Sequence, residues 1–265
     1  MSLIEGPEGP LEVLVTGTGE PVTVFAHGLA ASIEETRPFG SGVTGTRVFL
    51  HFRGHGASGV PDTTWTYSSV AADLMAVADA YGARRALGVS LGAGAVMRAA
   101  ATRPGMFDRI VLVLPGALDR PRDDAAIARM HRMARLVLEA DVEALTAVII
   151  EEQPLGARSR EDVRVWAARR AGRLASAQVA KALLDLPARY PVDAATDLSV
   201  VTCPALVIGQ EQDGAHPAEL AREIAHRLPH AQLRIFDGEG LVWAHRQELR
   251  ELVSSFLNSA ERQPG

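Results

Sequence analysis

A strand-like run, a turn centred on a serine and a helix built from small residues follow one another between residues 85 and 97. The turn reads Gly88-Val89-Ser90-Leu91-Gly92, a G-x-S-x-G pattern. Because the serine in such a turn has a strained backbone, its neighbours must be small for the strand and the helix to approach each other. The helix N-terminus also supplies free N–H groups and a positive dipole end beside the serine oxygen. The segment therefore predicts a nucleophile elbow.

Ser90 is the candidate nucleophile of this elbow. A serine hydroxyl is unreactive at neutral pH unless a base takes its proton as it attacks. The alternative is a structural Gly-Ser-Gly turn without reactivity. The choice between the two depends on whether a base can be found elsewhere in the chain.

Apolar runs of strand length recur along the chain, each bounded by glycine or proline. They cover residues 11–16, 22–26, 47–52, 85–89, 110–114, 205–208 and 232–236. Several are nearly continuous apolar stretches, as expected of strands buried on both faces of a parallel sheet. Helical patterns lie between the later runs, at residues 68–82, 217–228 and 246–257. This alternation predicts an α/β fold with a mostly parallel sheet, flanked by helices, whose first strands are antiparallel.

Residues 118–192 interrupt the alternation, because they contain no clear strand. Helical patterns occupy residues 124–140, 142–152, 160–171 and 175–186. We expect a helical cap folded over the carboxyl edge of the sheet, which is where open α/β sheets bind ligands. The predicted organisation is a first core part at residues 1–117, the cap at residues 118–192 and a second core part at residues 193–265.

Composition narrows the classes of partner. A net charge of −5 argues against a nucleic-acid binder, which would carry a basic face. The single cysteine cannot form an internal disulfide, and no run is long enough to span a bilayer. The start of the chain lacks the basic and apolar regions of a signal peptide. We expect a cytoplasmic protein with no membrane partner. A lone lysine among 27 basic residues favours a GC-rich bacterial genome.

Four stretches, in order, resemble the α/β-hydrolase family over nearly the whole chain. They are His27-Gly28-Leu29, the turn Arg53-Gly54-His55-Gly56-Ala57-Ser58, the elbow, and the strand from Cys203 to Gly209 with Asp213 and Pro217 after it. The resemblance implies the α/β-hydrolase fold, with the insertion as its cap. A serine at the elbow argues against the relatives that use an aspartate nucleophile, whereas cofactor-free haloperoxidases and carbon–carbon bond hydrolases share the serine.

The catalytic base is the point at which the sequence departs from the family. The family's histidine normally follows a glycine in the loop after the last strand, and residues 239–241 of this chain contain none. His245 is the nearest candidate, with an ordinary helix-start histidine as the alternative. Glu239 stands nearest the usual position, and His216, beside the acid, is a third candidate. A second departure is His51, where the family usually has an aspartate two residues before the arginine of its turn.

The other catalytic groups follow the family's order. Asp213 is the expected acid, because it lies in the loop after a strand and fits the chain order Ser, Asp, His. Glu211 is its rival, and a solvated loop acid is the alternative reading. The oxyanion hole is expected from the backbone N–H groups of Leu29 and Leu91.

Candidate substrate contacts come from the cap and the neighbouring loops. They are His27, Met130, Met133, Trp166 and Trp243. Methionine and aromatic residues at such spacing are more often core, and a histidine such as His27 more often stabilises a turn. His51 and His55 lie four apart with Gly54 between them, so no zinc site is expected.

The leading hypothesis is a cofactor-free serine hydrolase of a small carboxylic ester, thioester or lactone. Ser90 would form an acyl-enzyme, with Asp213 and His245 completing the catalytic group. The absent histidine keeps two alternatives open, namely a non-catalytic small-molecule-binding member of the fold and a non-hydrolytic lyase or cyclase. The expected partner is a small-molecule substrate, and a homo-oligomer is left open.

Overall fold

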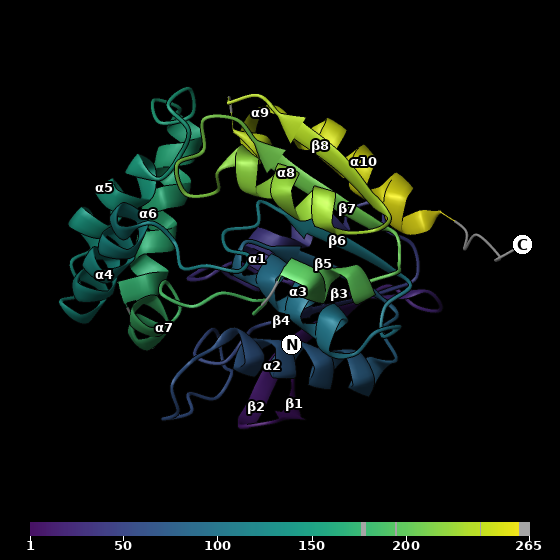
Figure 1. Cartoon of the computed structure of the whole chain (residues 1–265). Coiled ribbons are helices and arrows are strands. Elements are labelled where there is room, and N and C mark those ends of the chain that lie inside the picture. Colours follow the sequence, from purple (N-terminus) through teal and green to yellow (C-terminus); the bar gives the residue numbers. More distant parts are fainter. Residues whose placement is uncertain (176–178, 194, 239, 260–265) are drawn as a thin grey trace, which may run out of the picture.

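One eight-stranded sheet lies at the centre of the molecule in the computed structural model, which describes residues 1–175, 179–193, 195–238 and 240–259 (Figure 1). Across the sheet the strands run in the order β1-β2-β4-β3-β5-β6-β7-β8. Their bounds are β1 Ser2–Gly6, β2 Gly9–Thr16, β3 Val22–Ala26, β4 Thr46–Leu50, β5 Arg85–Val89, β6 Arg109–Val113, β7 Ala205–Gln210 and β8 Ala231–Phe236. Strand β2 pairs antiparallel with β1 and β4, and the other neighbours pair in parallel.

The sheet confirms the predicted fold class and corrects it at one edge. Strands β3, β6 and β7 are buried along their whole length, as their apolar runs predicted. Strand β1 was not predicted, because its exposed and half-buried residues lack an apolar face and its position is held by pairing with β2. An edge strand of this kind carries little sequence signal.

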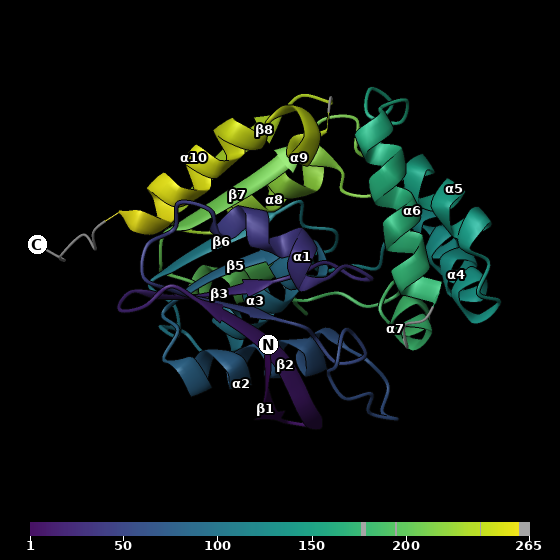
Figure 2. The ribbon, with the colours of Figure 1, turned by 180° about the vertical axis from the view of Figure 1, so that it is seen from behind.

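Helices cover both faces of the sheet, and the two apolar clusters of the core lie between them and the strands. On one face pack α2 (Tyr67–Tyr81), α3 (Leu91–Thr102) and α8 (Ala218–Arg227). On the other, seen in Figure 2, pack α1 (Ile33–Thr36), the 3-10 helix η1 (Arg37–Gly40) and α10 (Arg246–Asn258). The short helices η2 (Ala195–Val200) and α9 (Leu241–Ala244) lie in connections. No described helix is long and apolar enough to cross a membrane.

Four helices inserted between β6 and β7 form the cap. They are α4 (Asp124–Leu138), α5 (Val142–Glu151), α6 (Glu161–Ala175) and α7 (Ala180–Asp185). Asp123 and Asp141 begin α4 and α5, because each carboxylate accepts the N–H of the residue three positions later. The cap lies beyond the carboxyl ends of the strands in both views (Figures 1 and 2). The inserted helical region is thus confirmed, although residues 176–178 of its predicted last helix lie outside the described residues.

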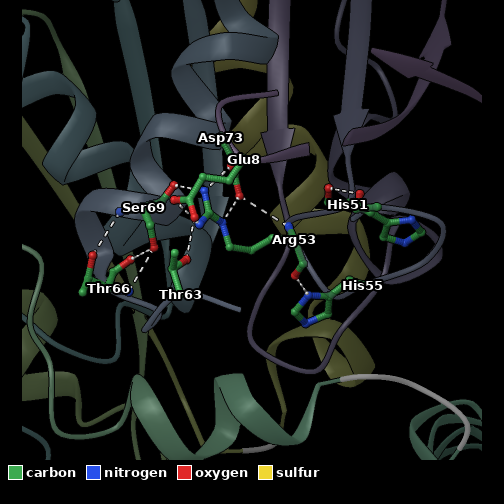
Figure 3. Close-up of polar contacts among 9 residues, drawn as sticks. Glu8, His51, Arg53, His55, Thr63, Thr66, Ser69 and Asp73 are labelled. Carbon is green, nitrogen blue, oxygen red and sulfur yellow. Dashed lines mark hydrogen bonds and ion pairs between the residues drawn. The ribbon is translucent and has the colours of Figure 1, made fainter. Parts of the chain in front are cut away.

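A buried arginine joins the antiparallel edge to the rest of the fold. Arg53, in the turn after β4, donates through Nε and Nη2 to the two carboxylate oxygens of Asp73 on α2, each at 2.7 Å. Its Nη1 donates to Glu8 at 2.9 Å and its Nη2 to the Ser69 carbonyl at 3.1 Å. Figure 3 shows the guanidinium between these partners. The two charges of the Arg53–Asp73 pair are almost completely shielded from solvent, with side-chain exposures of 2% and 1%.

Candidate active site

Ser90 occupies the turn between β5 and α3 with a left-handed backbone, φ +51° and ψ −104°. A non-glycine residue in such a conformation stores about 1–3 kcal/mol of strain. The flanking glycines are required, because a Cβ on Gly88 would lie 2.1 Å from the Gly92 carbonyl oxygen and one on Gly92 would lie 2.3 Å from the Ala26 carbonyl oxygen. The strand–turn–helix geometry predicted for this segment is therefore present, with the serine at its apex.

His216 is the base-type residue at this serine. Its Nε2 lies 2.9 Å from Ser90 Oγ, and its Nδ1 lies 3.2 Å from Asp213 Oδ2. With Nδ1–H donating to the carboxylate, Nε2 is left to accept the serine proton. Asp213 Oδ1 also accepts the N–H groups of Ala215 and His216, at 2.9 and 3.0 Å. Burial opposes the charge on Asp213, but His216 and these hydrogen bonds outweigh it and lower the pKa of the carboxyl.

His245 does not take the place that the sequence analysis gave it. Its Nε2 lies 2.6 Å from Asp237 Oδ1, and its Nδ1 faces Glu248 at 3.9 Å. Both ring nitrogens thus face carboxylates, one on Asp237 directly after β8 and one on Glu248 in α10, and the hydrogen bond to Ser90 is made by His216 instead. Glu239, the other candidate for the base, lies outside the described residues.

The signal that could have identified His216 is its spacing from Asp213. An aspartate that accepts the N–H groups two and three residues later forms a tight turn, which brings the side chain of the third residue back over the carboxylate. Glu211, the rival acid, pairs with Arg222 on α8 and is not part of this turn.

The expected oxyanion donors flank Ser90 on its two sides. A Cβ on Gly28 would lie 3.5 Å from Ser90 Cβ, so the loop after β3 passes directly beside the nucleophile. Within the described part of the chain, the backbone N–H groups of Leu29 and Leu91 have no protein acceptor. Two uncommitted donors beside a serine oxygen are the arrangement that stabilises a tetrahedral oxyanion.

Three buried histidines hold the loop that carries Leu29. His55 Nε2 accepts the N–H of Ala30 at 3.1 Å, and His51 Nε2 accepts the N–H of Ile33 at 2.9 Å. His27, a candidate substrate contact in the sequence analysis, is completely buried, and its two ring nitrogens contact the Gly28 carbonyl and the Phe52 N–H. These contacts give His27 a structural position beneath the loop. Among the described residues no cluster of histidine, cysteine or acidic side chains is arranged to hold a metal ion.

The histidine contacts predict a loss of stability in mild acid. Burial lowers the pKa of the His55 imidazole from 6.5 to about 4. The unfolded chain therefore binds this proton at a higher pH than the folded one, and the folded state loses stability as the pH falls from 6.5 towards 4. We expect His55 to account for a loss of up to about 3 kcal/mol across this window. Urea unfolding at a series of pH values measures it, and His55→Gln should flatten the dependence. Equal slopes in the two proteins would contradict this assignment.

A cavity of about 1470 Å³ separates the cap from the carboxyl edge of the sheet and opens onto Ser90 and His216. The other four predicted substrate contacts line it: Met130, Met133, Trp166 and Trp243. The two tryptophans, one from the cap and one from α9, meet edge to face with ring centroids 5.3 Å apart. These four side chains give their part of the cavity wall an apolar surface.

Three cap arginines donate hydrogen bonds to the loops that carry the candidate catalytic groups. Arg122 donates to the Ala215 carbonyl at 2.9 Å and Arg129 to the Gly214 carbonyl at 3.3 Å, the two central residues of the turn that ends in His216. Arg170 on α6 donates to the Leu29 carbonyl at 3.3 Å. The cap therefore contacts both the base loop and the oxyanion loop through charged donors, which make the stronger class of hydrogen bond.

The sheet order, the serine elbow and the inserted cap together define the class of α/β-hydrolase folds. The chain belongs to the alpha/beta hydrolase family, whose sequence profile matches residues 23–253.

Solved structures of enzymes share the fold over almost the whole chain. An enol-lactonase from Burkholderia xenovorans is 19% identical, with a TM-score of 0.82 and coverage of 97% of this chain and 100% of its own. An esterase from Exiguobacterium antarcticum is 18% identical, with a TM-score of 0.79 and coverages of 97% and 99%. A thermophilic esterase from Thermogutta terrifontis is 20% identical, with a TM-score of 0.70 and coverages of 94% and 95%. At these identities the similarity establishes the fold alone.

Proposed function

We propose that the protein is a serine hydrolase that cleaves a small carboxylic ester, thioester or lactone through an acyl-enzyme on Ser90. The observation that carries the proposal is the 2.9 Å contact between Ser90 Oγ and His216 Nε2, with Asp213 behind the imidazole. A serine that is paired with an oriented base has the activation that nucleophilic catalysis requires. The esterases and the lactonase that share the fold are consistent with this chemistry.

The first half of the reaction forms the acyl-enzyme. Ser90 Oγ attacks the substrate carbonyl carbon while His216 Nε2 takes the hydroxyl proton, and Asp213 stabilises the resulting imidazolium. The carbonyl oxygen becomes an oxyanion between the N–H groups of Leu29 and Leu91, where each donor is worth about 3 kcal/mol. The intermediate collapses as His216 returns the proton to the departing alcohol or thiol.

The second half releases the acid. Water attacks the acyl carbonyl and gives a proton to His216, and the second tetrahedral intermediate uses the same oxyanion donors. Ser90 leaves as its oxygen recovers the proton from His216. In a lactone the leaving alkoxide stays attached to the acyl group, so the product is a hydroxy acid. The protein's own residues supply every catalytic group, and the substrate and water are the reactants that this scheme requires.

The two alternatives from the sequence have lost their main argument. A binding protein or a lyase was considered because the usual position of the base holds no histidine, and His216 now stands at the serine. The hydrolytic scheme uses each of the groups gathered there, so it is the function that we propose.

Intact-protein mass after exposure to a small fluorophosphonate tests the proposal. Ser90 Oγ should attack the phosphorus and displace fluoride, giving one covalent adduct per chain that Ser90→Ala abolishes. Ser41→Ala is the matched control, because Ser41 lines the same cavity outside the elbow and its removal should leave labelling intact. The absence of an adduct on the folded wild-type protein, or an adduct that survives in Ser90→Ala, would overturn the proposal.

A further inference from the structure

Glu152 places a carboxyl group in the cavity beside the apolar wall. It follows α5 directly, is half-buried and lines the same space as Ser90 and His216. Within the described residues its carboxyl has no hydrogen bond and no ion pair. Glu35 and Asp213, which line the same cavity, are by contrast paired with Arg170 and His216. Glu152 is therefore a polar group that faces the cavity with its bonding capacity unused.

The backbone around Glu152 is held on both sides. Its own N–H donates to the Val148 carbonyl at 3.1 Å. Arg158 donates to the carbonyl of Glu151 at 2.6 Å and to that of Gln153 at 2.7 Å. The side chain of Gln153 accepts the Trp243 indole N–H at 3.3 Å. These hydrogen bonds fix the backbone from which the Glu152 carboxyl extends, and a group that selects a ligand requires such support.

The charges around Glu152 limit what could bind it. Burial raises the pKa of its carboxyl, although Arg170, His216, Arg129 and Arg122 act in the opposite direction. Because those neighbours are basic, an ammonium group brought to the carboxyl would be repelled by them. A neutral donor such as a hydroxyl satisfies the carboxyl without that cost, and it can donate to a carboxylate or accept from a protonated acid.

We propose that Glu152 is a specificity residue that binds a hydroxyl group of the substrate, so that the preferred substrates are hydroxylated esters or lactones. Met130, Met133 and Trp166 would enclose the hydrocarbon part of such a molecule, and Glu152 would supply the polar contact that orients it. The inference rests on the proposed hydrolase function and names the substrate class for the same site.

Matched ester pairs test this assignment on either side of the scissile bond. One pair is the p-nitrophenyl esters of ω-hydroxyhexanoate and heptanoate, and the other is pentanediol monoacetate and hexyl acetate. In each pair a hydroxyl replaces a methyl group. We expect kcat/KM to favour the hydroxyl compound about tenfold in at least one pair, as a hydrogen bond to a buried carboxyl would give. Equal or better turnover of the methyl compound in both pairs would overturn the proposal.

Two variants link the preference to the carboxyl. Glu152→Leu should remove the preference for the hydroxyl compound, and Glu152→Gln should keep part of it. Glu151→Gln is the matched control, because Glu151 is the exposed neighbour and pairs with Arg132. A preference that is unchanged in Glu152→Leu would assign the hydroxyl to another group and overturn the proposal.

Binding separates this inference from the hydrolase proposal. Calorimetric titration of the same esters into the Ser90→Ala protein measures the hydroxyl preference without turnover. Tighter binding of a hydroxyl compound, lost in Ser90→Ala/Glu152→Leu, supports the role of Glu152 even if no ester is hydrolysed. Turnover of methyl esters without any hydroxyl preference in rate or binding would overturn the inference and leave the hydrolase proposal standing.

Discussion

Replacing His216 by alanine is expected to lower kcat/KM for a small ester by about 10⁴-fold or more, whereas His245→Ala should leave it nearly unchanged. His216 Nε2 lies within hydrogen-bond distance of Ser90 Oγ, and in its absence no other side chain of the described residues is placed to accept the serine proton. His245, at the start of α10, contacts Asp237 instead of Ser90, so its replacement should have little effect on the reaction. Initial rates with a p-nitrophenyl ester measure both variants.

Two controls make the comparison decisive. Circular dichroism and the urea midpoint of His216→Ala should match those of the wild type, because the imidazole is partly exposed and not part of the core. Asp213→Asn should also be strongly impaired, since an amide cannot stabilise the imidazolium. If His245→Ala lost activity and His216→Ala kept it, the assignment of the base would be wrong.

The buried arginine of the sheet edge gives the largest expected effect on stability. Arg53→Met leaves the carboxylate of Asp73 buried without its bidentate partner, and we expect a loss of about 3–5 kcal/mol in the free energy of unfolding. Urea unfolding monitored by tryptophan fluorescence measures it. By comparison Glu8→Gln should cost less than about 1 kcal/mol, because this partner of Arg53 is one-third exposed.

A double variant separates the lost pair from the lost packing. In Arg53→Met/Asp73→Leu no buried charge remains, so much of the stability lost in the single variant should return. A double variant that is as unstable as Arg53→Met would show that the stabilisation comes from the other contacts of the arginine, to Glu8 and to the Ser69 carbonyl.

The core of the fold could be read from the sequence because its physical causes are local. Strands such as β3 and β6 are almost entirely apolar, since both of their faces are covered by helices. The end of α2 was also predicted, since the helical pattern stops at residue 82, where the structure has a left-handed Gly82. Strand β1 was missed because it depends on pairing with β2 rather than on its own composition.

The candidate site could be predicted only in part, because only some of its residues carry a local sequence pattern. Ser90 carries a strong local pattern, and Asp213 follows from its position after a strand. The base could not be predicted in the same way, because the loop that reaches Ser90 is determined by the tertiary structure and not by a local pattern. The sequence analysis placed the base after the last strand, at His245. In the structure the turn from Asp213 to His216 already brings an imidazole to both Asp213 and Ser90, so this arrangement needs no histidine later in the chain. The chain order Ser, Asp, His is the same in both assignments.

The arginine contacts between the cap and the core determine whether the cap could be exchanged for that of another protein. Arg122, Arg129 and Arg170 belong to the cap segment, yet their hydrogen bonds end on the carbonyls of Gly214, Ala215 and Leu29 in the core. A cap transplanted from a relative would have to bring three guanidinium groups to the same points, or the recipient core would lose support for its catalytic loops. In this protein the cap is therefore joined at three points to the loops that carry Leu29 and His216, and it cannot be exchanged as a separate module without replacing those contacts.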